Sequence, residues 1–227
     1  MSAQRRITRK EMKQDKLVTT AFRVSDYVQE NKPIFIIGLI VIIAIGAGVW
    51  WYNYSVEQKR AQSVAEIGKG DIAAMMGDAE GAIEYYLETI ENYGSTINGQ
   101  KAYIYLGRIY NDTGEYDKAR AIYQEYLDKF GEKGPDLLVR SAINGMAVAL
   151  RGLKDYILAA DYYLKAVEMS TSSEEKAYLL LDAARCYKAA KDKENALMVY
   201  ERIQEEHPLS LQRTAANKEI EEVKRMN

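Results

Sequence analysis

Four tyrosines recur through the chain at nearly constant spacing, and this spacing constrains the fold more than any other feature. Tyr86, Tyr123, Tyr163 and Tyr200 are separated by 37, 40 and 37 residues, and each follows an alanine by four residues. A structural unit of this length cannot bury an apolar face alone and must stack on its neighbours. The sequence therefore predicts an all-α solenoid with a concave binding surface.

The clearest unit spans residues 100–133 and combines small and large residues in a way that suits two antiparallel helices. Its signature positions are Leu106, Gly107, Tyr110, Gly114, Tyr116, Ala119 and Tyr123. Gly107 and Ala119 allow the helices to approach closely, and Gly114 permits the turn between them. This pattern resembles the tetratricopeptide repeat, and the resemblance implies about four helix–turn–helix repeats.

Three further units show the same pattern less completely. The unit at 177–210 ends at Pro208, which stops its second helix, and another unit begins at residue 140. The unit from residue 63 has a weak first helix, which suits a capping unit beside a membrane. The stretches YGSTING, FGEKGPD and STSSEE are predicted to be connecting loops. The final stretch, SLQRTAANKEIEEVKRMN, predicts a charged capping helix.

An apolar run near the N-terminus predicts a membrane anchor. Residues 34–52 are 19 consecutive apolar or aromatic residues without a charge. A helix of that length reaches about 28 Å, close to the thickness of the hydrocarbon core of a bilayer. Pro33 suits the first turn of the helix, and the aromatic residues from Trp50 to Tyr54 suit the interface at its far end. We therefore predict a single transmembrane helix over residues 33–54.

Two alternatives to an anchor fit the apolar run less well. A buried helix of a soluble protein could have the same composition. A cleavable signal peptide is another possibility, because Ala44 to Ala47 imitate a small-residue cleavage site. That site lies inside the apolar run, however, and the preceding segment of 33 residues is long for a signal peptide. An uncleaved anchor is the expectation.

The charge distribution predicts the orientation of the anchor. The residues before the run include eight basic and four acidic side chains, whereas the rest of the chain has more acidic than basic ones. Only Lys59 and Arg60 follow the run closely. The positive-inside rule therefore predicts a cytoplasmic N-terminus. In a bacterium, the domain of residues 55–227 would then lie in the periplasm, with the protein in the inner membrane.

The predicted cytoplasmic segment, residues 1–32, is basic and amphipathic. Apolar residues between Leu17 and Val28 share one side of a helix, while Lys13, Lys16 and Arg23 can reach acidic headgroups. The segment therefore either lies along the cytoplasmic leaflet or is a solvated tail that only fixes topology.

The sequence offers no convincing catalytic, metal or cofactor site. His207 is the only histidine and precedes Pro208 at a predicted helix end, and it has no neighbouring cysteine or histidine with ligand spacing. Cys186, the only cysteine, lies in a predicted helix and is expected to be a structural thiol. The net charge of −2 does not favour nucleic acid. We therefore predict a non-enzymatic protein without cofactor, metal or small-molecule substrate.

The resemblance to tetratricopeptide repeats implies which residues line the concave groove, because four positions of each first helix face it. The predicted groove residues are Lys101, Ile104, Arg108, Asn111, Asn144, Val148, Arg151, Tyr178, Leu181, Arg185 and Lys188. Basic and apolar groups alternate in this set. Such a lining either binds polypeptides, with the arginines engaging carboxylates, or is simply a solvated helix face.

At the level of the whole chain, the order of parts resembles the membrane-anchored ancillary subunit family of the bacterial Sec translocon. The segments that support this resemblance are VQENKPIFI, WWYNY, IENYGSTINGQKAYIYLG and ERIQEEHPLS. The resemblance implies a periplasmic repeat domain beside the channel, with translocon subunits, translocating chains and periplasmic chaperones as partners. The alternative is an envelope scaffold that assembles a different complex, for division, secretion or outer-membrane assembly.

Overall fold

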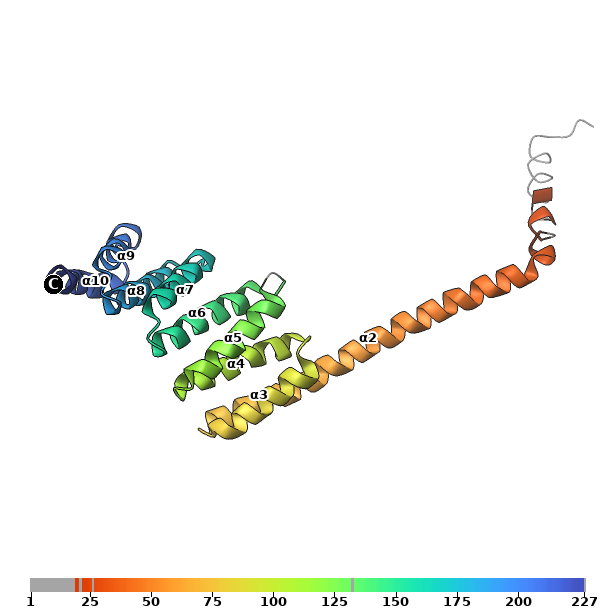
Figure 1. The fold of residues 1–227 in the computed structure, drawn as a ribbon. Coiled ribbons are helices and arrows are strands. Elements are labelled where there is room, and N and C mark those ends of the chain that lie inside the picture. The colour runs from red at the N-terminus through yellow and green to blue at the C-terminus, as the bar shows by residue number, and fades with distance from the viewer. Residues whose placement is uncertain (1–18, 21, 26, 132, 227) are drawn as a thin grey trace, which may run out of the picture. The chain divides into compact units, whose positions relative to one another are not determined.

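The computed structural model describes residues 19–226 except residues 21, 26 and 132, and its elements within this range are α-helices. They form two compact units, which divide between Glu57 and Gln58. The helices are α2 (Lys32–Met75), α3 (Ala79–Tyr93), α4 (Ile97–Asp112), α5 (Tyr116–Phe130), α6 (Asp136–Gly152), α7 (Tyr156–Met169), α8 (Ser173–Ala189), α9 (Lys193–Glu206) and α10 (Gln212–Lys224) (Figure 1). This architecture confirms the all-α prediction.

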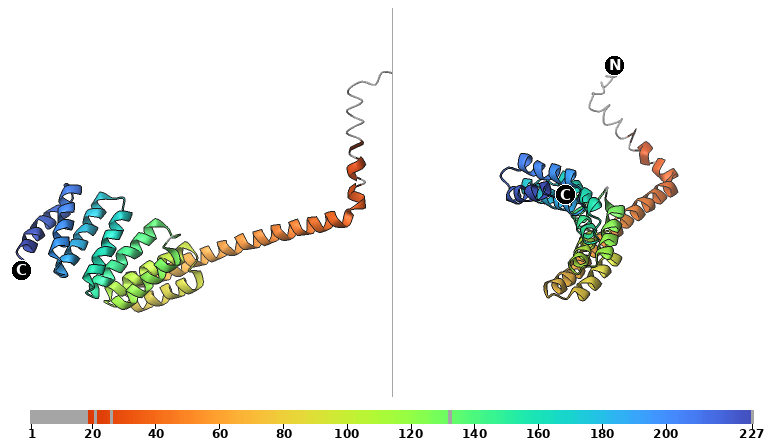
Figure 2. Two further views of the ribbon diagram at one scale, coloured as in Figure 1. Left: turned by 45° about the horizontal axis from the view of Figure 1, so that its top comes forward. Right: turned by 60° about the vertical axis from the view of Figure 1, so that its left-hand side comes forward.

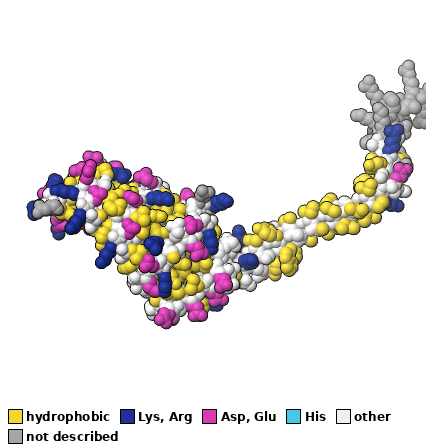
Figure 3. Space-filling model, in the orientation of Figure 1, with side chains coloured by type: hydrophobic (Ala, Val, Ile, Leu, Met, Phe, Trp, Pro, Cys, Tyr) yellow, Lys and Arg dark blue, Asp and Glu magenta, His cyan; other side chains and the backbone are white. Residues whose placement is uncertain are grey.

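The first unit contains the apolar run, which lies on α2. Pro33 occupies the first turn of this helix, where a missing N–H costs nothing. The most apolar stretch is not buried within the described structure, and its length and composition make it a candidate membrane span. Hydrophobic side chains cover this part of the helix (Figure 3). Much of the predicted basic segment, residues 1–32, lies outside the described residues.

The second unit is a row of helix pairs. The C-terminal part of α2 contacts α3, where the Tyr86 ring lies against Gly70 and its hydroxyl donates to Asp71. The pairs α4–α5, α6–α7 and α8–α9 follow, with α10 closing the row. Successive pairs turn relative to one another, so that the stack twists (Figure 2). The segment from residue 63, which the sequence suggested was a weak first helix, is a regular part of α2 with Ile67, Gly70 and Ala73 buried.

The same turn joins the two helices of each pair. In each pair, one residue of this turn has a positive φ in the left-handed region. It is Gly77 in the first pair, Gly114 in the second, Lys154 in the third and Lys191 in the fourth. An acidic residue follows each of them, and its backbone N–H donates to a carbonyl of the last turn of the preceding helix, as from Asp192 to Tyr187 at 2.9 Å. The turn expected at Gly114 therefore recurs in all four pairs, including two without glycine.

The core forms where a small residue on a first helix meets the tyrosine of the second helix. Tyr86, Tyr123, Tyr163 and Tyr200 are each at most 2% exposed. A methyl group added at Gly107 would lie 2.5 Å from Cζ of Tyr123, so the helices approach more closely than any larger residue permits. Ala119 is fully buried in the same pair. The packing role expected of these small residues is thus visible directly.

The connections between pairs are shorter than the sequence suggested. Thr96 and Ser172 cap α4 and α8 by accepting hydrogen bonds from the N–H groups of Gly99 and Glu175. Residues 97–99 and 173–175, which were expected to be loop, therefore belong to these helices. The capping side chains outweigh the loop-like composition of the residues that follow.

The close approach at Gly107 predicts the outcome of a simple substitution. Gly107→Ala should lower the free energy of unfolding by about 1 to 3 kcal/mol, because the new methyl group overlaps the Tyr123 ring. Gly68→Ala is the matched control, since no atom lies within 4 Å of a methyl group there. It should raise stability by up to about 1 kcal/mol through helix propensity. Urea denaturation of the full chain in detergent, followed by circular dichroism, measures both. Equal urea midpoints for the two variants would show that the close contact between Gly107 and Tyr123 does not contribute to stability.

Candidate functional site

The predicted groove residues all lie on the first helices of the pairs. Four are on α4, three on α6 and four on α8. Along the stack, the first helix α4 packs against the first helix α6, and α8 packs against the capping helix α10. Most of these side chains are half-buried or exposed, but Leu181 is only 5% exposed and so contributes to the core. Tyr178 is 55% exposed.

A cavity of about 390 Å³ lies at the junction of α4 and α6. Five predicted residues line it, namely Ile104, Arg108, Asn111, Asn144 and Val148. Sequence reasoning missed the other lining residues, which are Tyr105, Asp112, Tyr123, Ser141 and Gly145. The lining combines apolar side chains with one cation, one carboxylate and several hydrogen-bonding groups.

A second cavity of about 390 Å³ adjoins the C-terminal end of α2. Asp71, Met75, Tyr86 and Tyr105 are among its lining residues, and Arg108 belongs to its wall as well as to that of the first cavity. Sequence reasoning missed this cavity because it gave little weight to the helix that forms its wall. Met75 is 88% exposed, so the mouth of the cavity has an accessible apolar side chain.

Arg108 is the cation shared by the two cavities. Its guanidinium lies over the ring of Tyr105, with 5.4 Å between the guanidinium carbon and the ring centroid. The side chain is exposed, and it forms no ion pair with any other residue that the structure describes. No described carboxylate therefore offsets the positive charge of the Arg108 guanidinium.

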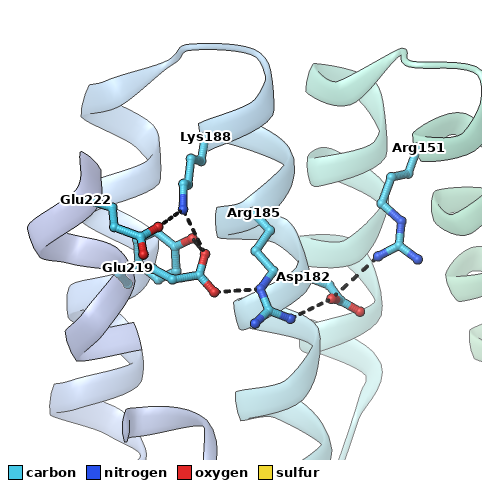
Figure 4. Close-up of polar contacts among 7 residues, drawn as sticks. Arg151, Asp182, Arg185, Lys188, Glu219 and Glu222 are labelled. Carbon is cyan, nitrogen blue, oxygen red and sulfur yellow. Dashed lines mark hydrogen bonds and ion pairs between the residues drawn. The ribbon is translucent and has the colours of Figure 1, made fainter. Parts of the chain in front are cut away.

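The basic residues at the C-terminal end of the groove are paired within the chain. Arg151 lies 3.5 Å from Asp182, which also lies 3.9 Å from Arg185. The Arg185 Nε donates to Glu219 of α10 at 2.8 Å, and Lys188 contacts Glu219 and Glu222 at 3.4 and 2.6 Å. Figure 4 shows these contacts joining α8 to α10 on one side and to Arg151 on the other.

This network gives the three arginines different roles. The sequence suggested that Arg108, Arg151 and Arg185 engage partner carboxylates alike. Asp182 of α8 already pairs with Arg151, and Glu219 of the capping helix α10 pairs with Arg185. The described structure thus divides the groove into an open half at α4 and α6 and an internally paired half at α8 and α10.

The pKa values of the two central carboxyls differ in direction. Burial raises the pKa of the Glu219 carboxyl, but hydrogen bonds from Tyr200 and Arg185 outweigh it and hold the pKa below the ordinary glutamate value. Burial dominates at Asp182 and raises its pKa, despite the nearby Arg151 and Arg185. Glu219 is therefore the carboxylate that the network stabilises most clearly in its charged form.

His207 and Cys186, the two residues of potential reactivity, are buried. His207 is 7% exposed, and its Nδ1 lies 2.8 Å from the hydroxyl of Ser173. Burial raises the pKa of the Cys186 thiol to about 11, so the thiol stays protonated at neutral pH. Within the described part of the chain, no cluster of three or more histidine, cysteine or acidic residues has the geometry of a metal site.

Comparison with known proteins agrees with this architecture. Two tetratricopeptide-repeat family models match, one at residues 67–135 and one at residues 178–210. The chain contains tetratricopeptide repeats. Repeats of this kind typically form non-catalytic scaffolds for protein–protein interaction, which makes the groove the natural candidate site.

Solved structures share the fold of these tetratricopeptide repeats. The crystal structure of BtubC (BKLC) from P. vanneervenii is 21% identical, with a TM-score of 0.55, over 69% of this chain and 70% of that one. A Podosopora anserina structure described as a kinesin light chain of nearly identical TPR-like repeats is 14% identical, with a TM-score of 0.59, over 72% and 86% of the two chains. At these identities the likeness establishes the fold alone. No curated protein matches the chain significantly.

The network around Glu219 predicts a pH-dependent contribution to stability. Because its pKa is lower in the folded state, Glu219 stabilises the fold at pH values above its unfolded pKa of about 4.3, and this contribution disappears as the pH falls further. Glu219→Gln should therefore cost about 1 to 3 kcal/mol at pH 7. The difference from the unsubstituted chain should narrow below about pH 4.

Urea midpoints of the full chain between pH 7 and pH 3 test this prediction. Glu205→Gln is the control, because Glu205 is exposed on α9 and forms no ion pair with a described residue. It should change the midpoint little at any pH. A Glu219→Gln penalty that persisted unchanged at pH 3 would show that shape, and not charge, makes the contribution.

Proposed function

We propose that α2 anchors the protein in the bacterial inner membrane, with the N-terminus in the cytoplasm and the repeats in the periplasm. The uncharged run of residues 34–52 supports the anchor, and the basic residues before it support the orientation. We further propose that the repeats bind other polypeptides beside the Sec channel and assist the handling of translocated proteins. The order of anchor and repeats, and the resemblance to ancillary translocon subunits, support this role.

The observation that carries the binding role is the open junction of α4 and α6. Its cavity has the volume of a small ligand pocket and combines Ile104 and Val148 with Arg108, which forms no ion pair with a described residue. An extended or helical polypeptide can place apolar side chains in such a cavity and a carboxylate against the guanidinium. No metal, cofactor or nucleophile is required for this function, so the protein acts by binding.

In-cell photo-crosslinking tests the partners directly. A photoreactive amino acid at Ile104 probes the open groove, and one at Trp51 probes the end of the candidate span. We expect secreted chains or periplasmic chaperones to be trapped at Ile104 and translocon subunits at Trp51, as identified by mass spectrometry. Ala121, exposed on α5, is the control position and should give few adducts. A consistent set of other envelope proteins at both positions would instead support the scaffold for a different complex.

The orientation can be tested separately by thiol labelling. Cys186 is only 1% exposed and should not react, so Glu205→Cys introduces one accessible thiol on α9. A membrane-impermeant maleimide should label this variant in cells with a permeabilised outer membrane. The chain without the substitution is the control. Labelling that appeared only after the inner membrane was lysed would contradict the periplasmic location.

A further inference from the structure

The repeats place four residues at equivalent positions, and these residues differ in chemistry. The four residues are Tyr105, Gly145, Asp182 and Glu219. The first three each lie 18 residues before a repeat tyrosine, and Glu219 lies 19 residues after Tyr200, as Asp182 does after Tyr163. The contacts confirm this register, because each of the last three meets the end of the preceding first helix. The contacts are Asn111–Gly145, Arg151–Asp182 and Lys188–Glu219. The same place in the groove is thus occupied by a glycine once and by a carboxylate twice.

Glu219 shows how this place holds a carboxylate. One of its oxygens accepts from the Arg185 Nε at 2.8 Å, and the other accepts from the Tyr200 hydroxyl at 2.6 Å. Lys188 adds a third donor at 3.4 Å. The side chain of Glu219 is 14% exposed, so these groups replace most of its water. An arginine, the repeat tyrosine and a donor one turn later therefore make a complete carboxylate site.

The junction of α4 and α6 has donors at the same three positions without the carboxylate, although the Asn111 amide donates to the Gly145 carbonyl at 3.0 Å. Arg108, Tyr123 and Asn111 are the equivalents of Arg185, Tyr200 and Lys188, and all three line the cavity. Gly145 supplies no side chain, and the Tyr123 ring takes the space that its Cβ would need. The Tyr123 hydroxyl donates a long hydrogen bond of 3.5 Å to the carbonyl of Ile104, and the Asn111 side chain lies beside it.

Nearby acidic residues do not fill this place. Asp112 lines the same cavity, and Asp71 lines the adjoining one, where it accepts a hydrogen bond from Tyr86 at 2.7 Å. Neither forms an ion pair with Arg108 in the described structure. The hydroxyls of Tyr86 and Tyr200 both donate to a carboxylate, whereas that of Tyr123 donates to a backbone carbonyl.

We propose that this cavity is a vacant copy of the Glu219 site and binds the side-chain carboxylate of an aspartate or glutamate in a partner polypeptide. The Arg108 guanidinium and the Tyr123 hydroxyl hold the carboxylate, and the Asn111 amide lies where Lys188 lies in the occupied copy. Ile104 and Val148 receive an apolar side chain beside it. The inference rests on the proposed function of the groove and names the chemistry of its ligand. A side chain is the source because side-chain carboxylates fill the two equivalent places.

Peptide binding to the full chain in detergent tests this proposal. The probe is a random library of 12-residue peptides, each prepared with an amidated and with a free C-terminus. Bound peptides should contain an aspartate or glutamate whose change to the amide weakens binding about tenfold to a hundredfold. Arg108→Gln should cause a similar loss, and combining both changes should cost little more than either one. Tyr123→Phe should weaken binding in the same direction.

Arg120→Gln on the exposed face of α5 is the matched control and should leave binding unchanged. Urea midpoints exclude misfolding of the variants. Peptides that bind equally to the Arg108→Gln variant, or that require a free C-terminus, would overturn the carboxylate proposal but leave the polypeptide groove intact. Failure of every peptide to bind would overturn both proposals.

Discussion

The contact between a small residue and a tyrosine sets the geometry of the whole array. Gly107 allows the Tyr123 ring to approach its helix, and Gly70 does the same for Tyr86 in the preceding pair. Because this contact recurs at intervals of 37 to 40 residues, the concave positions of each first helix recur with it. The chemistry of the groove therefore depends on which residues occupy equivalent positions.

The capping helix α10 has two consequences for the groove. It covers the apolar end of the stack with Ala216, Ile220 and Val223, as a terminal unit must. It also brings Glu219 against Arg185 and Tyr200, which neutralises the adjoining part of the groove. Half-buried charges are stable when each has a partner, and α8 and α10 provide such partners for each other. The carboxylates of α8 and α10 therefore pair the basic residues at this end of the groove, while Arg108 on α4 forms no ion pair with a described residue.

The sequence was sufficient where a local pattern determines the structure. The positions of Gly107 and Ala119 relative to Tyr123 predicted the helix pair, and five of the residues expected in the groove on α4 and α6 line a cavity, whereas Lys101 and Arg151 do not. The sequence did not predict long-range pairing. Glu219 lies past the last repeat, so its contact with Arg185 became visible only in the folded structure. Gly145 was missed as a lining residue of that cavity because glycine has no side chain to mark it as part of a site.

A photo-crosslinking scan along the first helices tests the division of the groove most directly. The reactive residue would be placed in turn at Ile104 and Val148 in the open half, and at Tyr178 and Ala189 in the paired half, with adduct yields compared in intact cells. The account predicts that adducts with partner polypeptides concentrate at Ile104 and Val148. Equal or higher yields at Tyr178 and Ala189 would contradict it, because the half closed by Glu219 would then be the one that binds.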